Sequence, residues 1–392
     1  MLFTFKNVYR AYKACRKHKT NTLNALKFEQ NLLENLWDLV YDLQNRSYKI
    51  GQSICFLTHS PKLREVFAAD FRDRVVHHLL INAIEPYYEK RFINDLYNNR
   101  KKRGIHQAVK KAQSYMHKTH KGYYLQLDIK GFFYNLDKNI LFKNMFDELS
   151  EHKFDDVSLT PYGKHVGTVG CHFNAARDNY KKEIFYLLNK IIYHDPTRNY
   201  RFKGDKSKLK LLPEHKTLFL LPKHKGLAIG NLTSQFFGNV YMSRFDNYLK
   251  RELKVKCYLR YVDDFVLFDK SKERLEALLA QISYYLKENL ALKLREDVKL
   301  KPHSSGLDFL GYIIREDYLL ARQRVVNNFK AQKAVYLNSY EAQKGKMNRE
   351  EIKAFLSVQA SFVSHIQHSN SFNLMKKVGV LDENNPFDYD RT

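Results

Sequence analysis

The sequence is poor in cysteine, and its four cysteines are widely scattered: Cys15, Cys55, Cys171 and Cys257. No CxxC pair occurs, so neither a zinc ribbon nor a disulfide framework is supported. Cys171-His172 is the one adjacent pair of soft ligands, and two ligands do not make a metal site. The sequence also lacks a run of 18 apolar residues and an apolar signal-peptide stretch near its start. We therefore expect a cytoplasmic protein that has no membrane span.

Acidic residues are scarce relative to basic ones. The 392 residues include 67 Lys and Arg against 42 Asp and Glu, which gives a net charge of +25. Such an excess repels itself unless a polyanion neutralises it. The basic residues are interleaved with 27 Tyr and 27 Phe, and grooves for nucleic acid combine cations with aromatic rings in this way. The alternative interpretation is a solvated basic surface without a partner.

The hydrophobic pattern predicts an α+β fold with helices on one face of a sheet. Helices are expected at 22–46, at 70–93 with Asp70 as N-cap and Pro86 as a break or kink, near 179–193 and at 271–290. Strands are expected at 123–129, at 307–314 and, as a pair joined at an Asp-Asp turn, within 257–268. Segment 150–216 mixes charge, Gly and Pro and is interpreted as an insertion. The tail from about 322 is basic and is predicted to be helical.

Three carboxylates stand out against apolar surroundings. Asp128 ends a predicted strand, and Asp263-Asp264 lies between Tyr261-Val262 and the apolar run 265–268. Burying carboxylates without partners costs several kcal/mol per group, and a divalent cation would offset that cost. Mg²⁺ prefers a few carboxylates together with substrate phosphates. The alternative is that Asp263-Asp264 marks a hairpin turn with both acids in water.

Six ordered motifs resemble those of bacterial reverse transcriptases of the group II intron-like lineage. They are PKLREVFAADFRDRVVHHLL at 61–80, RKKRGIHQAV at 100–109, LQLDIKGFFYNLD at 125–137, GLAIGNLTSQFFGNVY at 226–241, YVDDFVLF at 261–268 and GLDFLGYII at 306–314. The resemblance implies a right-hand polymerase fold, with an antiparallel palm sheet that carries the Asp triad. Its parts would be an N-terminal helical extension at 1–60, fingers at 61–121, a palm at 122–320 with the insertion at about 150–216, and a small helical thumb-like region at 321–392.

The resemblance also implies roles for individual residues. Asp128, Asp263 and Asp264, with the backbone carbonyl of Ile129, would bind two Mg²⁺ ions, for which Mn²⁺ could substitute. Binding of the incoming dNTP is implied for Lys62, Arg64, Phe133, Ile229, Gly230 and Gln235. Phe133 would exclude a 2′-hydroxyl. The alternative is that Phe133 or its neighbour Phe132 is simply a core residue, because only one of the two rings can face the site. Contact with the nucleic acid is implied for Arg74, Arg103, Tyr261 and Gly311.

Two departures from the family pattern concern the pocket. Ala228-Ile229-Gly230 stands where many of these enzymes have Pro-Gln-Gly, so Ile229 replaces a polar residue. An apolar pocket discriminates between polar partners less well than a hydrogen-bonding one, and we expect unusual fidelity or template use. The Lys often found after the helix that follows YxDD has no secure counterpart, since Lys299 is one position away.

The resemblance favours cDNA synthesis from an RNA template with dNTPs. No nuclease or integrase segment is recognisable. IGNLTSQ is similar to diversity-generating and defence-associated enzymes, and the expected role is antiphage defence with a dedicated non-coding RNA, an accessory protein or a second reverse transcriptase. Error-prone cDNA synthesis in a diversity-generating element is the first alternative. A catalytically silent RNA-binding scaffold is the second. Oligomerisation remains open.

Overall fold

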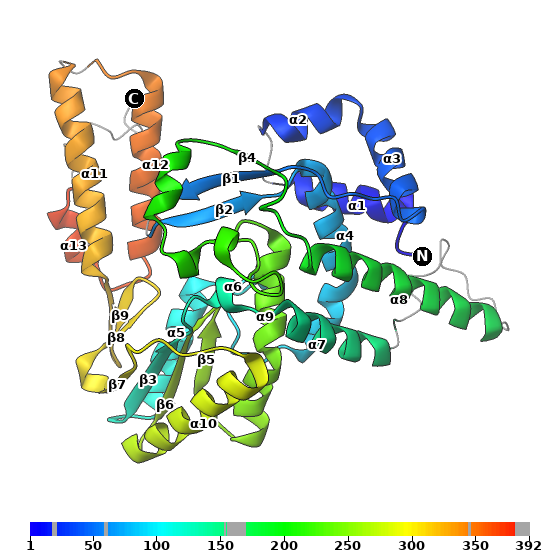
Figure 1. Cartoon of the computed structure of the whole chain (residues 1–392). Coiled ribbons are helices and arrows are strands. Elements are labelled where there is room, and N and C mark those ends of the chain that lie inside the picture. Colours follow the sequence, from blue (N-terminus) through cyan, green and yellow to red (C-terminus); the bar gives the residue numbers. More distant parts are fainter. Residues whose placement is uncertain (18–21, 59–61, 153, 155–169, 344–345, 381–392) are drawn as a thin grey trace. The chain divides into compact units, whose positions relative to one another are not determined.

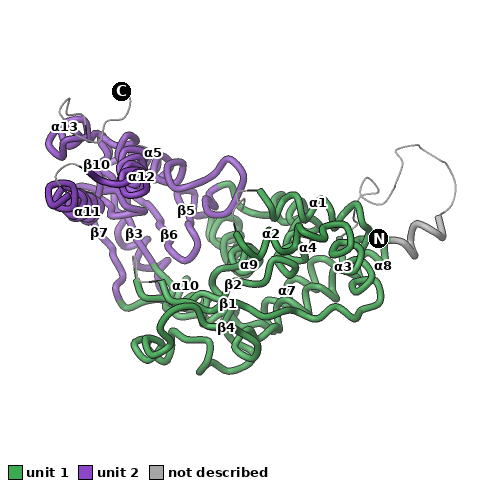
Figure 2. The backbone as a smooth tube through the Cα atoms, turned by 90° about the horizontal axis from the view of Figure 1, so that it is seen from above, with its two compact units in different colours: residues 1–94, 128–254, 281–296 green, residues 95–127, 255–280, 297–392 purple. Residues whose placement is uncertain are grey.

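The computed structural model of the chain describes residues 1–17, 22–58, 62–152, 154, 170–343 and 346–380, without the side chains of 170–176. The chain divides into two compact units, which are coloured separately in Figure 2. Unit 1 comprises residues 1–94, 128–254 and 281–296, and unit 2 comprises 95–127, 255–280 and 297–392. Each unit contains both helices and strands (Figure 1), which confirms the expected mixture of helix and sheet.

Unit 1 is built on two long helices that contact each other, α4 (Phe71–Arg91) and α9 (Leu232–Asn247). Most residues of α9 are buried. A helix that carries apolar or small residues all round is covered by other elements on every side. The helices α1 (Phe5–Arg16), α7 (Lys138–Glu151) and α8 (Gly170–Ile192) pack around this pair. The helix expected near 179–193 is therefore the second half of the longer α8.

The expected features of α4 are confirmed except for the break at proline. The Asp70 carboxylate accepts a hydrogen bond of 3.0 Å from Arg72 N, and Asp70 is the N-cap. Pro86 lies inside the helix, which continues to Arg91. Proline removes one backbone donor, but Ile84, Tyr87 and Tyr88 around it are buried and their packing keeps the helix continuous.

The single helix expected at 22–46 is wrong. The structure has α2 (Leu23–Gln30) and α3 (Leu32–Gln44), separated at Asn31, where φ is −124° and ψ is 51°. The Asn35 side chain donates to Phe28 O at 2.8 Å and thereby satisfies a carbonyl freed by the break. The break lets α2 contact α4 while α3 contacts α1. One straight helix would not bury both apolar faces in this way.

A three-stranded sheet in unit 1 has the order β2-β1-β4. β1 (Ser53–Thr58) and β2 (Arg64–Ala68) are antiparallel, with Cys55 opposite Phe67. β4 (Tyr200–Phe202) runs parallel to β1. The 150–216 segment therefore contributes a strand to this sheet, and the β1–β2 hairpin crosses the predicted boundary between 60 and 61. Residues 153 and 155–169 of that segment lie outside the described residues.

Unit 2 contains a four-stranded sheet of order β5-β6-β3-β7. Its strands are β5 (Tyr258–Tyr261), β6 (Asp264–Asp269), β3 (Tyr123–Asp128) and β7 (Lys299–Pro302). The β5–β6 and β3–β7 pairs are antiparallel. Helix α5 (Ile105–Lys118) contacts β5 and β6 and shares a buried core with them. The two strands expected within 257–268 and the strand expected at 123–129 are confirmed, and so is the helix expected at 271–290, as α10 (Lys272–Leu290).

The single strand expected at 307–314 is wrong. The segment forms a hairpin of β8 (Leu307–Phe309) and β9 (Tyr312–Ile314), which continues to β10 (Leu319–Ala321). Leu310 and Gly311 form the turn, with φ of 51° and 91°. Positive φ at both central positions is characteristic of tight hairpins, and the apolar run conceals this turn.

The tail is helical as expected. It contains α11 (Gln323–Ala342), α12 (Arg349–Ile366) and the short α13 (Phe372–Lys377). Asn348 and Glu351 form a capping box at the start of α12. Phe329 and Phe362 stack with ring centroids 4.0 Å apart and join α11 to α12. Within the described part of the chain, no helix is both long and apolar enough to cross a membrane.

Candidate functional site

The Asp-Asp motif lies on a tight β-hairpin in unit 2. Tyr261 pairs with Asp264, so Val262 and Asp263 are the two turn residues. Val262 has φ of +60°. A β-branched residue in this region is an outlier and stores on the order of 1–3 kcal/mol of strain, which persists only where the surroundings impose it.

Two buried side chains hold the strained residue. Val262 N donates to Asn98 Oδ1 at 2.9 Å, and Arg260 Nη1 donates to Val262 O at 2.8 Å. Asn98 is 4% exposed and Arg260 is fully buried. The backbone of Arg260 is in turn hydrogen-bonded to Asp95 O and Tyr97 N. Segment 95–98 therefore supports the hairpin from the side of β5.

Asp264 lies beside the neighbouring strand β3. Gln126 Nε2 donates to Asp264 Oδ1 at 3.3 Å and to Asp308 O at 3.1 Å. The other oxygen of this amide, Gln126 Oε1, is buried and has no hydrogen-bond partner among the described residues. Because side chains alternate along a strand, Asp128 points to the same face of β3 as Gln126, two residues later.

Asp128 is the last residue of β3, and its described partners are in unit 1. Arg295 Nη1 donates to Asp128 Oδ2 at 2.9 Å, and Arg295 N donates to Asp128 O at 2.9 Å. Ile129 is buried and forms an isolated bridge with Leu294. The segment after α10 thus holds the end of β3 through both its backbone and a cation.

The three aspartates suit Mg²⁺ in the kind of donor they provide. Asp128 is 35% exposed at its side chain, and Asp263 and Asp264 are partly exposed. Hard carboxylate oxygens that remain open to solvent are the ligands this ion takes, and it completes its shell with water and phosphate oxygens. Among the described residues, no group of three His, Cys, Asp or Glu side chains is close enough to hold a metal by itself. The orphaned Gln126 Oε1 is an acceptor that a metal-bound water could satisfy.

Phe132 and Phe133 are distinguished by burial. Phe132 is 2% exposed, and Phe133 is partly exposed. A Cβ on Gly238 of α9 would lie 3.1 Å from the Phe132 ring and 3.5 Å from the Phe133 ring. Both rings therefore lie against that helix, and Phe132 is the core residue of the two. Phe133 is the ring of this pair that reaches the surface.

The predicted phosphate-binding residues lie at the start of β2. Lys62 and Arg64 are exposed. Glu65 and Phe67 alternate with more exposed residues along β2 and are buried on the other face of the strand. Glu65 accepts from Thr217 Oγ1 at 2.7 Å and from Leu218 N. Burial raises the pKa of Glu65. This carboxylate ties the strand to the segment that leads to residue 226.

Segment 229–231 lies along β2 in unit 1. Phe67 N donates to Ile229 O at 2.9 Å. Asn231 accepts from Ala69 N at 3.1 Å and donates to Phe67 O at 3.1 Å. Gly230 has φ of +120°, and a Cβ there would lie 2.6 Å from Val66, so only glycine fits. Gln235 is exposed on α9.

Sequence reasoning gave no role to several of the residues that hold these segments in place. The amide of Asn231 in IGN was the available signal, because Asn at a break between two elements commonly bonds to the backbone. Asn98, Arg260 and Gln126 had no local signal, since their partners are distant in the sequence or belong to the other strand of a pair.

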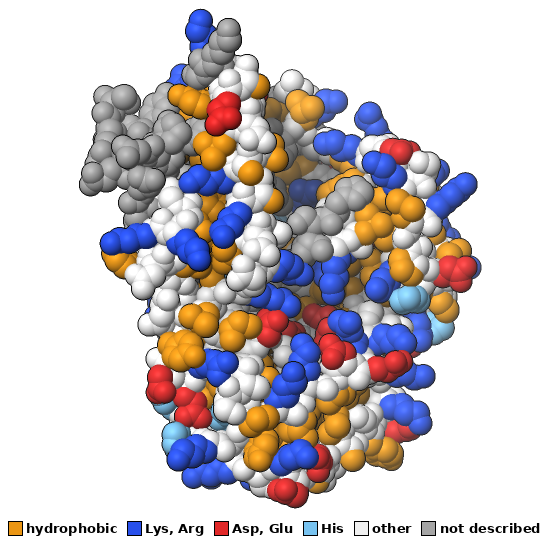
Figure 3. Space-filling model, turned by 90° about the vertical axis from the view of Figure 1, so that its left-hand side faces the viewer, with side chains coloured by type: hydrophobic (Ala, Val, Ile, Leu, Met, Phe, Trp, Pro, Cys, Tyr) orange, Lys and Arg blue, Asp and Glu red, His pale blue; other side chains and the backbone are white. Residues whose placement is uncertain are grey.

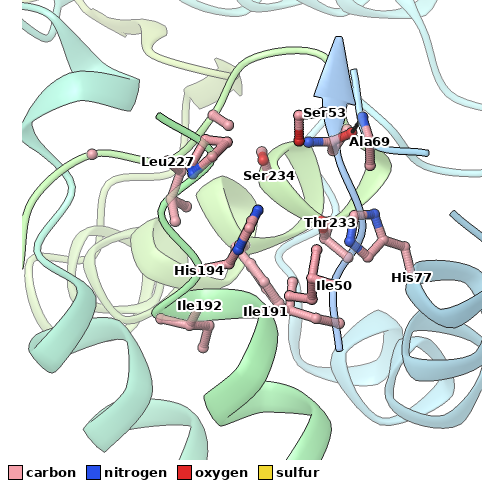
Figure 4. Close-up of a pocket in the computed structure, with 15 residues that line it drawn as sticks. Ile50, Ser53, Ala69, His77, Ile191, Ile192, His194, Leu227, Thr233 and Ser234 are labelled. Carbon is pink, nitrogen blue, oxygen red and sulfur yellow. Dashed lines mark hydrogen bonds between the residues drawn. The ribbon is translucent and has the colours of Figure 1, made fainter. Parts of the chain in front are cut away.

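A small cavity lies behind segment 226–231. It measures about 30 Å³ and is lined by residues that include Ser53, Ala69, His194, Leu227 and Ser234 (Figure 4). His194 Nε2 is buried and has no hydrogen-bond partner among the described residues, and burial lowers the pKa of His194. A space of this size holds about one or two waters. It is too small for a nucleotide, and it lies behind the predicted nucleotide segment.

The predicted nucleic-acid residues are dispersed over the two units. Arg74 donates to Ala69 O at 2.8 Å in unit 1. In unit 2 the Arg103 guanidinium lies over the Tyr97 ring, 5.6 Å from its centroid, and Tyr261 is partly buried beside the core, where burial raises its pKa. Gly311 accepts from Arg322 N at 2.9 Å, and a Cβ there would lie 3.0 Å from His365 of α12.

The Cys171-His172 pair and Lys299 were assigned no role from the sequence. The side chains of Cys171 and His172 lie outside the described residues. Lys299 Nζ lies 4.0 Å from Asp297 Oδ2 and is 35% exposed.

Lys and Arg side chains are spread over the face shown in Figure 3, among hydrophobic and acidic ones. This distribution agrees with the net charge of +25.

No protein-family model matches the sequence. The chain is similar to Protein YkfC of Escherichia coli (strain K12), with 25% identity over 288 residues, or 70% of this chain and 69% of that protein. It is also similar to telomerase from Candida albicans in complex with the TWJ fragment of telomeric RNA, with 10% identity and a TM-score of 0.44 over 88% of this chain and 61% of that chain.

Apo telomerase from Candida tropicalis is similar at 11% identity and a TM-score of 0.44, over 84% of this chain and 59% of that chain. The chain thus spans about three fifths of these telomerase chains. TM-scores at this level do not establish a shared fold.

Proposed function

We propose that the chain is an RNA-directed DNA polymerase. The observation that carries the proposal is the two-residue hairpin that presents Asp263 and Asp264, with Val262 held in a strained conformation by Asn98 and Arg260. Strain imposed by buried partners is characteristic of functional sites, and valine is unusual at a turn position that glycine or asparagine commonly occupies. The six ordered sequence motifs support the same function.

In this proposal Asp128, Asp263, Asp264 and the Ile129 carbonyl hold two Mg²⁺ ions, or Mn²⁺ in their place. When bound, these ions would activate the primer 3′-hydroxyl and stabilise the leaving pyrophosphate. Gln126 orients the Asp264 carboxylate, and Arg295 orients that of Asp128.

The remaining residues bind and select the dNTP and its template. Lys62 and Arg64 are exposed cations that suit the triphosphate. Phe133 reaches the surface and is the ring that would exclude a 2′-hydroxyl. Ile229, Gly230 and Gln235 are proposed to line the nucleotide pocket, and Arg74, Arg103, Tyr261 and Gly311 to contact the nucleic acid.

Primer extension on an RNA template with Mg²⁺ and dNTPs tests this function. We expect extension by the wild type and loss of extension in Asp263→Ala, while Asp317→Ala, an exposed aspartate outside the site, remains active. An RNA-binding assay on the same variants distinguishes the scaffold alternative. Tight RNA binding without extension by the wild type on any template would favour the scaffold.

The biological role that we propose is antiphage defence with a dedicated RNA or a partner protein. Error-prone cDNA synthesis in a diversity-generating element is the alternative, because IGNLTSQ resembles both groups. Sequencing the nucleic acid that copurifies with the protein distinguishes them. A cDNA copied from one dedicated non-coding RNA supports defence, and a mutated copy of a repeat within a target gene supports diversification.

A further inference from the structure

Helices α2 and α3 expose an unusual amount of apolar surface. Of the 16 large hydrophobic side chains that are exposed in the described residues, five lie between residues 23 and 41. Three of them, Leu33, Trp37 and Tyr41, are 64%, 57% and 68% exposed. They are four residues apart on α3 and therefore form one stripe along the helix. An apolar patch of this kind, rimmed by polar residues, marks an interaction surface.

The stripe continues from α3 onto α1, which lies beside it (Figure 1). Trp37 stacks on Phe5 with ring centroids 4.6 Å apart, and Phe5 stacks on Tyr9 at 6.1 Å. Lys13 Nζ lies over the Tyr9 ring, 5.1 Å from its centroid. An aromatic ladder thus runs across the two helices and ends at a cation.

The two helices that carry this ladder have charges of opposite sign. α3 has the acidic residues Glu34, Asp38 and Asp42 and no basic residue, although the chain has a net charge of +25. Asp42 pairs with Arg72, while Glu34 and Asp38 are exposed. On α1 the exposed charges are all positive, at Lys6, Arg10 and Lys13.

The charges decide between kinds of partner. The acidic residues of α3 repel phosphates, which disfavours RNA and an anionic membrane as occupants of the part of the stripe that lies on α3. A two-fold axis through the ladder would place α3 of one copy against α1 of the other, so that acidic residues meet basic ones twice. Such self-complementarity is what an isologous interface requires. Exposed aromatic residues that bury roughly 150–250 Å² each are also the anchors typical of interfaces.

We infer that the α1–α3 face is a dimer interface for a second copy of this chain, independent of the proposed polymerase activity. Trp37 is the sole tryptophan, so its fluorescence reports directly on this face. As concentration rises, Trp37 emission shifts to shorter wavelength in step with the dimer fraction measured by analytical ultracentrifugation. Tyr41→Ala weakens both transitions. Tyr284→Ala, which removes a 70% exposed tyrosine on α10, changes neither.

Charge reversal tests the pairing itself. Asp38→Lys and Arg10→Glu each weaken dimerisation by about tenfold or more, because each reversal is present twice in a two-fold dimer. The double variant recovers most of the affinity, since the reversed charges again face opposite ones. Circular dichroism verifies that the exposed substitutions leave the fold intact.

Three results would overturn the inference. The first is a chain that stays monomeric at every concentration with solvent-exposed Trp37 emission. The second is a dimer whose formation leaves that emission unchanged. The third is a short RNA that shifts the Trp37 emission of the monomer, which would assign the face to nucleic acid instead.

Discussion

Asp73 is a carboxylate buried at the start of α4. It is 1% exposed and accepts hydrogen bonds from Tyr48 Oη at 2.6 Å and Gly51 N at 2.9 Å. Burial outweighs these bonds and raises the pKa of Asp73 from 3.8 to about 6. The group joins α4 to the segment before β1, so its ionisation bears on the stability of unit 1.

We predict that the stability difference between Asp73→Asn and the wild type depends on pH. Because the folded-state pKa is raised, the stabilisation from protonated Asp73 is complete below pH 3.8 and is lost as the pH rises through about 6. From pH 4 to pH 7 the wild type should lose on the order of 3 kcal/mol relative to the variant. Urea unfolding of both proteins across this range measures the difference. A difference that is constant with pH contradicts the prediction.

Ile229 carries the residue-scale prediction about selectivity. Its backbone is held by Phe67 N, and its side chain is apolar where a polar residue is common in the resembled family. Ile229→Gln should restore hydrogen bonding in the pocket and lower misincorporation, because a polar pocket rejects mismatched groups more strongly. Sequencing cDNA made by both proteins from one template measures this. Equal error rates would refute it.

At the scale of elements, the hairpin of the Asp pair depends on partners from elsewhere in the chain. The strained φ of Val262 is maintained by Asn98, which is 164 residues away in sequence, and by Arg260. Both residues bond to the backbone of Val262, and in the proposed mechanism they are positioning residues.

Asn98→Ala should lower kcat by about tenfold, because relaxation of a turn that stores on the order of 1–3 kcal/mol displaces Asp263 and Asp264. KM for the dNTP should change little, and more Mg²⁺ should be needed for half-maximal activity. Asn98→Asp keeps the acceptor oxygen and should restore part of kcat. If Asn98→Ala only reduces the amount of folded protein and leaves the Mg²⁺ concentration for half-maximal activity unchanged, Asn98 has a merely structural role.

Local patterns predicted several elements of the fold. They predicted α4 with its Asp70 cap, α10, and the pair of strands around Asp263-Asp264, because these depend on periodicity and local turn chemistry. The breaks at Asn31 and at Leu310-Gly311 were missed, because helix packing and sheet pairing impose them on runs that look continuous. The carboxylates of the candidate site were named from sequence motifs alone, and their catalytic role stays a prediction. Asn98 and Gln126 were not named, because long-range hydrogen bonds leave no local pattern.

At the scale of the whole molecule, the charge of +25 predicts a salt-dependent affinity for RNA, the proposed template. If six or more phosphates are contacted, affinity should fall by about 10³-fold or more between roughly 50 and 200 mM salt. The slope of log affinity against log salt concentration should become shallower in Arg64→Ala by about 0.9, the contribution of one phosphate contact. Lys272 Nζ lies 3.3 Å from Glu276, and Lys272→Ala should leave the slope unchanged. Filter binding at several salt concentrations measures the slopes. An affinity that is independent of salt would exclude a phosphate-tracking surface.

The most direct test of the account is single-nucleotide incorporation on an RNA template, compared among the wild type, Asp128→Asn, Asp263→Asn and Asp264→Asn. Each variant removes one charge while keeping a similar shape, and RNA binding should remain close to that of the wild type. We predict that each rate falls by about 10³-fold or more, because several kcal/mol of charge stabilisation is lost. A wild-type rate in any of the three variants would contradict the assignment of the Asp triad as the catalytic centre.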